Sequence, residues 1–176
     1  MTKSTSTLSA ARLSAVAAMA VAFAGVTAGG AHAADVVRHK IPNSDFPIAL
    51  AVEVPADKTT VYVSGTVPPM VDESAPKTSV KAFGDTKTQT VGVLKEIDKI
   101  LKTAGIGMGD VVKMQVFLVG DPAKGDRMDF AGFMEGYRKF FGTPEQPNLP
   151  ARSAMQVAGL VNPGWLVEIE VTAVKP

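Results

Sequence analysis

Residues 148–176, NLPARSAMQVAGLVNPGWLVEIEVTAVKP, combine a single arginine with an apolar C-terminal strand that carries two carboxylates. In the segment 167–174, apolar and polar residues alternate, which predicts a half-buried β-strand. Glu168 and Glu170 then point to one face, while the valine and isoleucine residues beside them pack against a core on the other. The strand therefore offers two negative charges to a binding surface, and alternation alone does not distinguish one glutamate from the other.

The N-terminal segment predicts export. Lys3 and Arg12 make a basic start, an Ala-rich apolar run begins at Leu13, and AHA at residues 31–33 is a small-residue cleavage site. The run is shorter than the roughly 20 strongly apolar residues that cross a bilayer. We expect a signal peptide over residues 1–33, cleaved after Ala33 or alternatively after Ala34. The mature chain should then be exported without a membrane span, to the periplasm where the cell has two membranes.

Composition excludes several kinds of site. The 18 basic and 17 acidic residues of the whole chain become 16 and 17 after residues 1–33 are removed, a net charge of −1, because that segment holds two basic residues and no acidic one. This balance offers no nucleic-acid-binding patch and no support for ribonuclease activity. The chain has no cysteine, so no disulfide framework is expected. His39 is the only histidine after residue 33, which argues against a histidine-rich metal site or a histidine-based triad.

The remaining pattern predicts one α+β domain over residues 34–176. Strands are expected at residues 36–41, 48–54, 59–65, 110–119, 153–160 and 165–174, and helices at 85–104 and 130–141. The turn composition of residues 55–58, PADK, predicts a hairpin between the second and third strands. Residues 66–85, rich in proline, serine and charge, should form a surface loop. Two helices separated by a strand suggest that both cover one face of a mixed sheet.

Both predicted helices carry an apolar stripe. In the first, the stripe comprises Val91, Leu94, Ile97, Leu101 and Ala104, and Asp85 is the expected N-cap. In the second, the stripe is Phe130, Phe133, Met134, Tyr137, Phe140 and Phe141. We interpret this aromatic stripe as core packing against the sheet.

Six segments in this order and spacing resemble one known family. They are VYVSGTVP (61–68), Gln89, LKTAGIGMGDVVKMQVFL (101–118), FAGFMEGYRKFF (130–141), PARSAMQVAGL (150–160) and VEIEVTAV (167–174). Together they resemble the RidA/YjgF family, the reactive intermediate deaminases, from about Phe46 to Lys175. The resemblance implies a chorismate-mutase-like fold with a mixed six-stranded sheet, assembled as a homotrimer with clefts between subunits.

The resemblance also implies an activity and a site. Enzymes of the family hydrolyse reactive enamines and imines, such as those related to 2-aminoacrylate, to keto acids and ammonia without a cofactor or a metal. The family's substrate-binding arginine falls on Arg152 and its catalytic glutamate on Glu168. Ser153 and Ala154, with the Ser64–Gly65 turn, would complete the cleft for a small imino or keto acid.

Two departures from the family pattern keep a second function open. Ile48 stands near the position of a common tyrosine, and Met134 replaces an asparagine, so two polar groups are missing near the expected cleft. The alternative function is a non-catalytic trimer that binds a small carboxylate or holds client proteins. For Arg152 the alternative role is a surface or inter-subunit salt bridge, and for Glu170 it is a structural ion pair or a solvated position.

Overall fold

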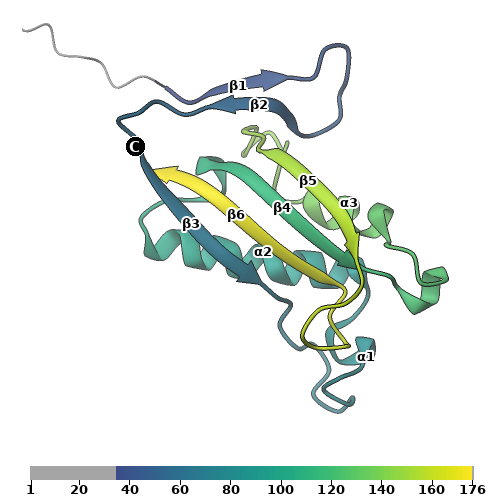
Figure 1. Ribbon diagram of the computed structural model, residues 1–176. Coiled ribbons are helices and arrows are strands. Elements are labelled where there is room, and N and C mark those ends of the chain that lie inside the picture. The colour runs from purple at the N-terminus through teal and green to yellow at the C-terminus, as the bar shows by residue number, and fades with distance from the viewer. Residues whose placement is uncertain (1–34, 176) are drawn as a thin grey trace, which may run out of the picture. The chain divides into compact units, whose positions relative to one another are not determined.

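The computed structural model describes residues 35–175, and the predicted signal peptide at residues 1–33 lies outside them. Figure 1 shows the chain as a sheet with helices along it. The elements in chain order are β1 (Val37–Lys40), β2 (Ala49–Glu53), β3 (Thr59–Thr66), α1 (Val80–Phe83), α2 (Thr86–Thr103), η1 (Met108–Asp110), β4 (Val111–Val119), η2 (Pro122–Lys124), α3 (Phe130–Tyr137), β5 (Ala151–Val157) and β6 (Val167–Lys175).

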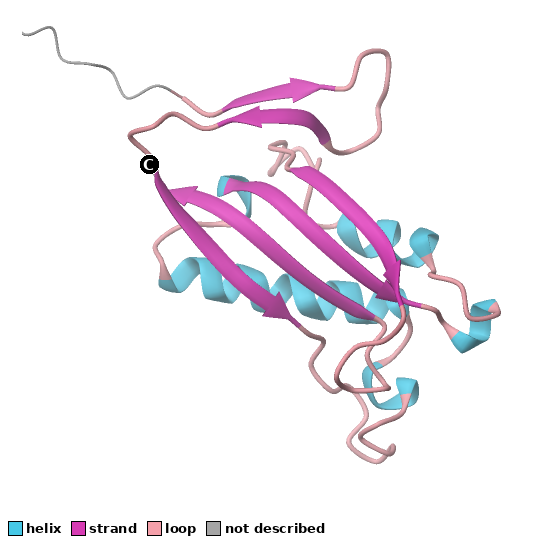
Figure 2. Ribbon diagram, viewed as in Figure 1, coloured by secondary structure: helices cyan, strands magenta, loops and turns pink. Residues whose placement is uncertain are grey.

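The sheet has six strands in the order β1-β2-β5-β4-β6-β3. β5 runs parallel to β4 and β2, whereas β6 is antiparallel to both β4 and β3. Figure 2 shows α2 and α3 on a single side of strands β3 to β6. The predicted α+β class, with a mixed six-stranded sheet and two main helices on one face, is confirmed.

The predicted hairpin between the second and third strands is wrong. β2 pairs instead with β1, from Val37↔Glu53 to Lys40↔Ala49, and β3 pairs with β6 at the far edge of the sheet. Most side chains of β2 are exposed, so pairing with it would bury little. Pairing of β3 with β6 buries Val63 against the helices, and this apolar burial outweighs the short loop between β2 and β3.

The core lies between the sheet and the helices. β4 and β6 contribute alternate side chains to it, and the α2 side chains Leu94, Ile97 and Leu101 are fully buried against them. Val93 is buried on α2 while Val91 is only half-buried, so the stripe is centred slightly differently from the prediction. The aromatic stripe of α3 is core as interpreted, with Phe133, Tyr137 and Phe141 almost completely buried.

Several predicted elements have different limits in the structure. β5 covers Ala151–Val157 and not residues 153–160, and β6 begins at Val167 and not at residue 165. α3 ends at Tyr137 and not at residue 141, because Lys139 and Phe140 donate to the carbonyls of Gly136 and Tyr137, three residues back, and tighten the last turn. The predicted loop at residues 66–85 contains the short helix α1. That helix is stabilised by a small second core in which Phe83 packs edge-on against Trp165 at 6.1 Å.

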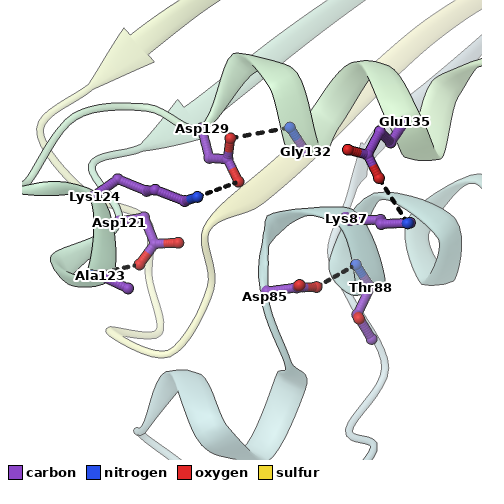
Figure 3. A network of polar contacts seen from close by, with 9 residues as sticks. All are labelled: Asp85, Lys87, Thr88, Asp121, Ala123, Lys124, Asp129, Gly132 and Glu135. Carbon is purple, nitrogen blue, oxygen red and sulfur yellow. Dashed lines mark hydrogen bonds and ion pairs between the residues drawn. The ribbon is translucent and has the colours of Figure 1, made fainter.

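Aspartates cap the helices that follow the loops (Figure 3). Asp85 accepts a hydrogen bond from Thr88 N at 2.8 Å at the start of α2, which confirms the predicted N-cap. Asp129 caps α3 in the same way through Gly132 N at 3.0 Å. The side chains of Lys87 and Glu135 form an ion pair at 2.6 Å that joins α2 to α3. This exposed pair links the first turn of α2 to the last turn of α3.

Gln89 ties α2 to the start of β6. Its amide nitrogen donates to the carbonyls of Gly84 and Gly164, at 2.9 and 3.0 Å, and its amide oxygen accepts from Leu166 N at 2.7 Å. The side chain is fully buried, and each of these contacts satisfies a backbone group that would otherwise lack a partner. One residue therefore determines where β6 begins relative to the helix. Across residues 35–175, none of the helices has the length and apolar character needed to traverse a lipid bilayer.

We expect Asp85→Ala to destabilise the protein by about 1 kcal/mol at pH 7, because α2 loses its cap. Hydrogen bonding from Thr88 lowers the pKa of Asp85, so the folded carboxylate titrates below the unfolded one. The contribution is therefore complete above pH ~4 and is lost as the pH falls through the folded value. Urea unfolding of wild type and variant at pH 7 and pH 3 measures this difference. Asp85→Asn, which caps without charge, should keep most of the stability at both pH values.

We expect Gln89→Leu to cost about 3 kcal/mol in free energy of unfolding, since two carbonyls and one N–H remain buried without partners. Gln115→Leu, on the face of the sheet away from the helices, should change it by less than about 0.5 kcal/mol. Urea denaturation of both variants provides the comparison. A cost for Gln89→Leu as small as that of the control would show that the amide does not hold β6 in place.

Candidate active site

The two glutamates of β6 lie on the sheet face opposite the helices. Val167, Ile169 and Val171 are buried in the core, so Glu168 and Glu170 point to the other face, where both are half-buried. The parity predicted from the alternating sequence is therefore correct. We call this face of strands β3 to β6 the open face.

Glu168 lies against Gly65, and the predicted Ser64–Gly65 turn is instead an irregular part of β3. The register of β3 on β6 shifts between Val63 and Thr66, so Ser64 and Gly65 leave the regular ladder and are exposed. A Cβ atom at residue 65 would overlap Glu168 Oε1, so any residue other than glycine would force the carboxylate to move. The structure thus brings together two of the predicted site residues, Glu168 of β6 and Gly65 of β3.

Glu170 lines a separate hollow on the open face. The hollow has a volume of about 330 Å³, and its other polar side chains come from β3, β4 and β6: Tyr62, Ser64, Lys113, Gln115 and Thr172. Glu168 is not among the residues that line it. The two glutamates therefore have different surroundings, a distinction that the sequence alone did not supply.

Arg152 lies on the opposite face, under α3. β5 aligns it with Met114 of β4, whose side chain is fully buried in the core. Its guanidinium carbon is 4.3 Å from the centroid of the Tyr137 ring and 5.0 Å from that of Phe133. Phe46 and Phe130 lie at 5.6 and 6.0 Å. The interpretation of the aromatic stripe as core packing missed this second role, in which its rings surround a cation.

The guanidinium of Arg152 has few polar partners, and the Tyr137 hydroxyl beside it partly offsets the effect of burial on its pKa. Nη2 donates to the thioether of Met134 at 3.2 Å, and Nη1 is buried without a hydrogen-bond acceptor among the described residues. Within residues 35–175, Arg152 forms no ion pair with a carboxylate, so the alternative of a salt bridge is not met inside the chain. Burial lowers the pKa of Arg152, although an arginine stays protonated at neutral pH. A buried cation with a free donor is a site for an anion.

The segment before β2 completes the surroundings of Arg152. The Tyr137 hydroxyl donates to the carbonyl of Pro47 at 2.9 Å and holds residues 46–48 over the start of β5. Burial raises the pKa of Tyr137, so this hydroxyl remains a donor. Ile48 is half-buried in this segment and contributes no side-chain donor or acceptor. Both sequence departures, Ile48 and Met134, therefore lie in the segments that enclose the arginine.

Ser153 and Ala154 follow Arg152 along β5, which is only partly covered at its outer edge. β2 pairs with β5 at a single position, Ala49↔Ala151, with a hydrogen bond from Ala49 N to Pro150 O of 3.0 Å. Backbone groups alternate in direction along a strand, so the N–H of Ala154 also points to this edge. Ser153 is exposed on the open face, and the Ala154 side chain is half-buried against the core. The backbone of Ala154 is thus available to a ligand beside Arg152.

Arg152 and Glu168 do not meet within one chain. β4 lies between their strands, and they align with Met114 and Phe117 of β4, residues of opposite parity. The arginine is therefore on the helix side of the sheet and the glutamate on the open face. Four of the predicted residues form two half-sites, Arg152 with Ala154 and Glu168 with Gly65. The other two lie elsewhere, Ser64 in the hollow of Glu170 and Ser153 on the open face.

Comparison with known proteins places the chain in a family. The family model described as Endoribonuclease L-PSP matches residues 46–175. The chain is 36% identical over 136 residues to the mouse 2-iminobutanoate/2-iminopropanoate deaminase, covering 77% of this chain and 87% of that protein. It is 39% identical over 129 residues to the 3-aminoacrylate deaminase RutC of Acinetobacter baylyi, covering 72% and 90%.

A solved structure from another organism has a similar fold. The YjgF gene product of E. coli is 28% identical and superposes with a TM-score of 0.52, covering 77% of this chain and 93% of that one. The family model extends over most of the described residues and includes both half-sites. The chain belongs to the RidA/YjgF family.

Proposed function

We propose that this protein hydrolyses reactive imines and enamines of 2-imino acids, related to 2-aminoacrylate, to 2-oxo acids and ammonia without a cofactor. The observation that carries this proposal is the buried guanidinium of Arg152, which has a free donor and no carboxylate partner within residues 35–175. The names of relatives that are 36% and 39% identical support the same chemistry.

Arg152 would hold the substrate carboxylate. The planar guanidinium offers two parallel N–H donors, which match the two oxygens of a carboxylate. The N–H of Ala154, at the uncovered edge of β5, would add a third donor. Charge-assisted bonds of this kind are worth about 1.5–3 kcal/mol each, enough to orient a substrate of only a few atoms.

Glu168 would handle the protons of the reaction. An enamine must first be protonated on its terminal carbon to give the imine, and water then adds to the C=N carbon. The resulting aminoalcohol loses ammonia and becomes the 2-oxo acid, so one water is consumed for each ammonia released. The half-buried carboxyl group over Gly65 would give its proton to the enamine carbon when protonated, and the carboxylate left behind would take a proton from the attacking water.

This chemistry requires more than one copy of the chain. Arg152 and Glu168 lie on opposite faces of one sheet, so a ligand that touches both needs a half-site from each of two subunits. The open face carries apolar surface suited to such contact: Tyr62 is 81% exposed and Met155 is 39% exposed. We therefore include the homotrimer with inter-subunit clefts in the proposal.

We also propose that the protein works outside the cytoplasm. The basic start, the apolar run and the AHA site at residues 31–33 support removal of a signal peptide and export to the periplasm. The mature domain would then comprise residues 34–176. An exported deaminase would act on imines that form or arrive in the cell envelope.

The first test is the decay of 2-iminopropanoate, generated in situ from alanine by an amino-acid oxidase. We expect the mature protein to accelerate it and Arg152→Ala to lower kcat/KM by about 10- to 100-fold, since the carboxylate loses its charge-assisted bonds. Arg127→Ala, at an exposed arginine, is the matched control and should have the wild-type rate. If the folded, trimeric wild-type protein gives no acceleration, the substrate is wrong and the carboxylate-binding alternative takes its place.

A second test separates the two glutamates of β6. Glu168→Gln removes the proton-transferring group but keeps the side-chain shape, so kcat should fall by about 100-fold or more while KM changes little. Glu170→Gln is the matched control on the same face of the same strand and should keep most of the activity. Steady-state kinetics of both variants with 2-iminopropanoate measures the difference. The opposite ranking would move the catalytic role to Glu170 and its hollow.

A further inference from the structure

Met134 accepts a hydrogen bond from the Arg152 side chain. Its sulfur lies 3.2 Å from Nη2, and the side chain is 8% exposed. A thioether is a weak acceptor and donates no hydrogen bond. We propose that Met134 is a specificity-determining residue, which selects 2-imino acids with apolar side chains over those with polar ones. This inference rests on the proposed function, because it assigns a substrate class to the same site.

The position of the sulfur puts Met134 beside any ligand of the arginine. A carboxylate that engages both terminal nitrogens of Arg152 must take Nη2 from the sulfur, since that nitrogen is the one the thioether contacts. Once a carboxylate oxygen has replaced the sulfur at Nη2, the flexible methionine side chain still lies next to the ligand. The atoms that follow the substrate carboxylate therefore come into contact with Met134.

The other walls around the guanidinium are also apolar. Four aromatic rings lie within 6.0 Å of its central carbon, and the one hydroxyl among them, that of Tyr137, is already bonded to Pro47 O. Phe46 stacks on Phe130 with centroids 6.5 Å apart, and Phe130 in turn lies 6.0 Å from Phe133. A hydroxyl or amide on the substrate side chain would lose its water and find no donor here, and as acceptors only the weak thioether and the Tyr137 oxygen. An alkyl side chain would lose nothing and would gain contacts.

Asparagine at residue 134 would change this balance. An amide supplies two donors and an acceptor at the place of the thioether, so it can satisfy a polar substituent that Met134 leaves unpaired. Sites built to hydrogen-bond a polar group discriminate more strongly than sites that only accommodate one. The substitution Met134→Asn should therefore shift specificity towards polar imines, mainly through KM.

The experiment compares the imines of leucine and asparagine, whose side chains have nearly the same shape but opposite polarity. For the purified wild-type protein, we expect kcat/KM to be at least about 10-fold higher for the leucine imine. Met134→Asn should lower this ratio by about 10-fold or more, and Met134→Leu should keep it within about threefold. Met108→Asn is the matched control: Met108 is also 8% exposed in the core, and the ratio should not change. Circular dichroism verifies that each variant is folded.

Binding of the corresponding 2-oxo acids, measured by calorimetry, separates this inference from the proposed function. One outcome is that no imine is hydrolysed but the 2-oxo acid of leucine binds at least about 10-fold more tightly than that of asparagine. If Met134→Asn removes this difference in binding, the inference holds and the deaminase function fails. If imines are hydrolysed with no preference, or with a preference that Met134→Asn and Met108→Asn alter equally, the inference is overturned and the deaminase function stands. If Met134→Asn does not fold, the test is the preference of the wild-type protein for the leucine imine over the asparagine imine. The absence of that preference overturns the inference.

Discussion

The buried amide of Gln89 is the contact on which the geometry of this protein depends most. It joins the C-terminal end of α1, the body of α2 and the residues before β6 through three hydrogen bonds at 2.7 to 3.0 Å. A buried amide is tolerated only where its donors and acceptor are satisfied, so the three segments have one arrangement relative to each other. The first residue of β6 therefore has a defined position along α2. The alternation along β6 then directs its glutamates to the open face and its apolar residues to the core.

The sheet separates the two halves of the candidate site. β5 carries Arg152 to the helix side, β6 carries Glu168 to the open face, and β4 lies between them. No side-chain rotation brings these groups together across a layer of hydrogen-bonded backbone. A ligand that needs both groups cannot be bound by one copy of the sheet. Assembly of several copies would then be a condition for catalysis and not only a source of stability.

Arg152 is held in an unusual state for a buried charge. Aromatic rings surround it, a thioether accepts one of its donors and a second donor has no partner among the described residues. Cation–π contacts compensate part of the cost of removing the charge from water. They do so without a carboxylate from residues 35–175, which would compete with an anionic ligand. The rings thus leave a donor of the cation free, and the thioether of Met134 beside it is apolar and only a weak acceptor.

Local patterns determined much of this protein from the sequence alone. The helical periodicity of its apolar residues predicted α2, and the aspartate just before that segment, Asp85, predicted its N-cap. The alternation of apolar and polar residues predicted β6 and the face on which Glu168 lies. These features depend on residues a few positions apart, so a short window contains the information. The six ordered motifs also identified the family, and with it the candidate residues.

The tertiary structure alone decided which strands are neighbours and therefore which residues meet. The expected β2–β3 hairpin does not form, because β3 gains more burial beside β6 at the far edge of the sheet. The sequence pattern indicates only core packing for the aromatic stripe of α3, and its packing on β5 reveals that it also encloses Arg152. Strand order likewise puts Arg152 and Glu168 on opposite faces. Pairing and facing depend on the apolar area buried between segments distant in the chain, which no local pattern contains.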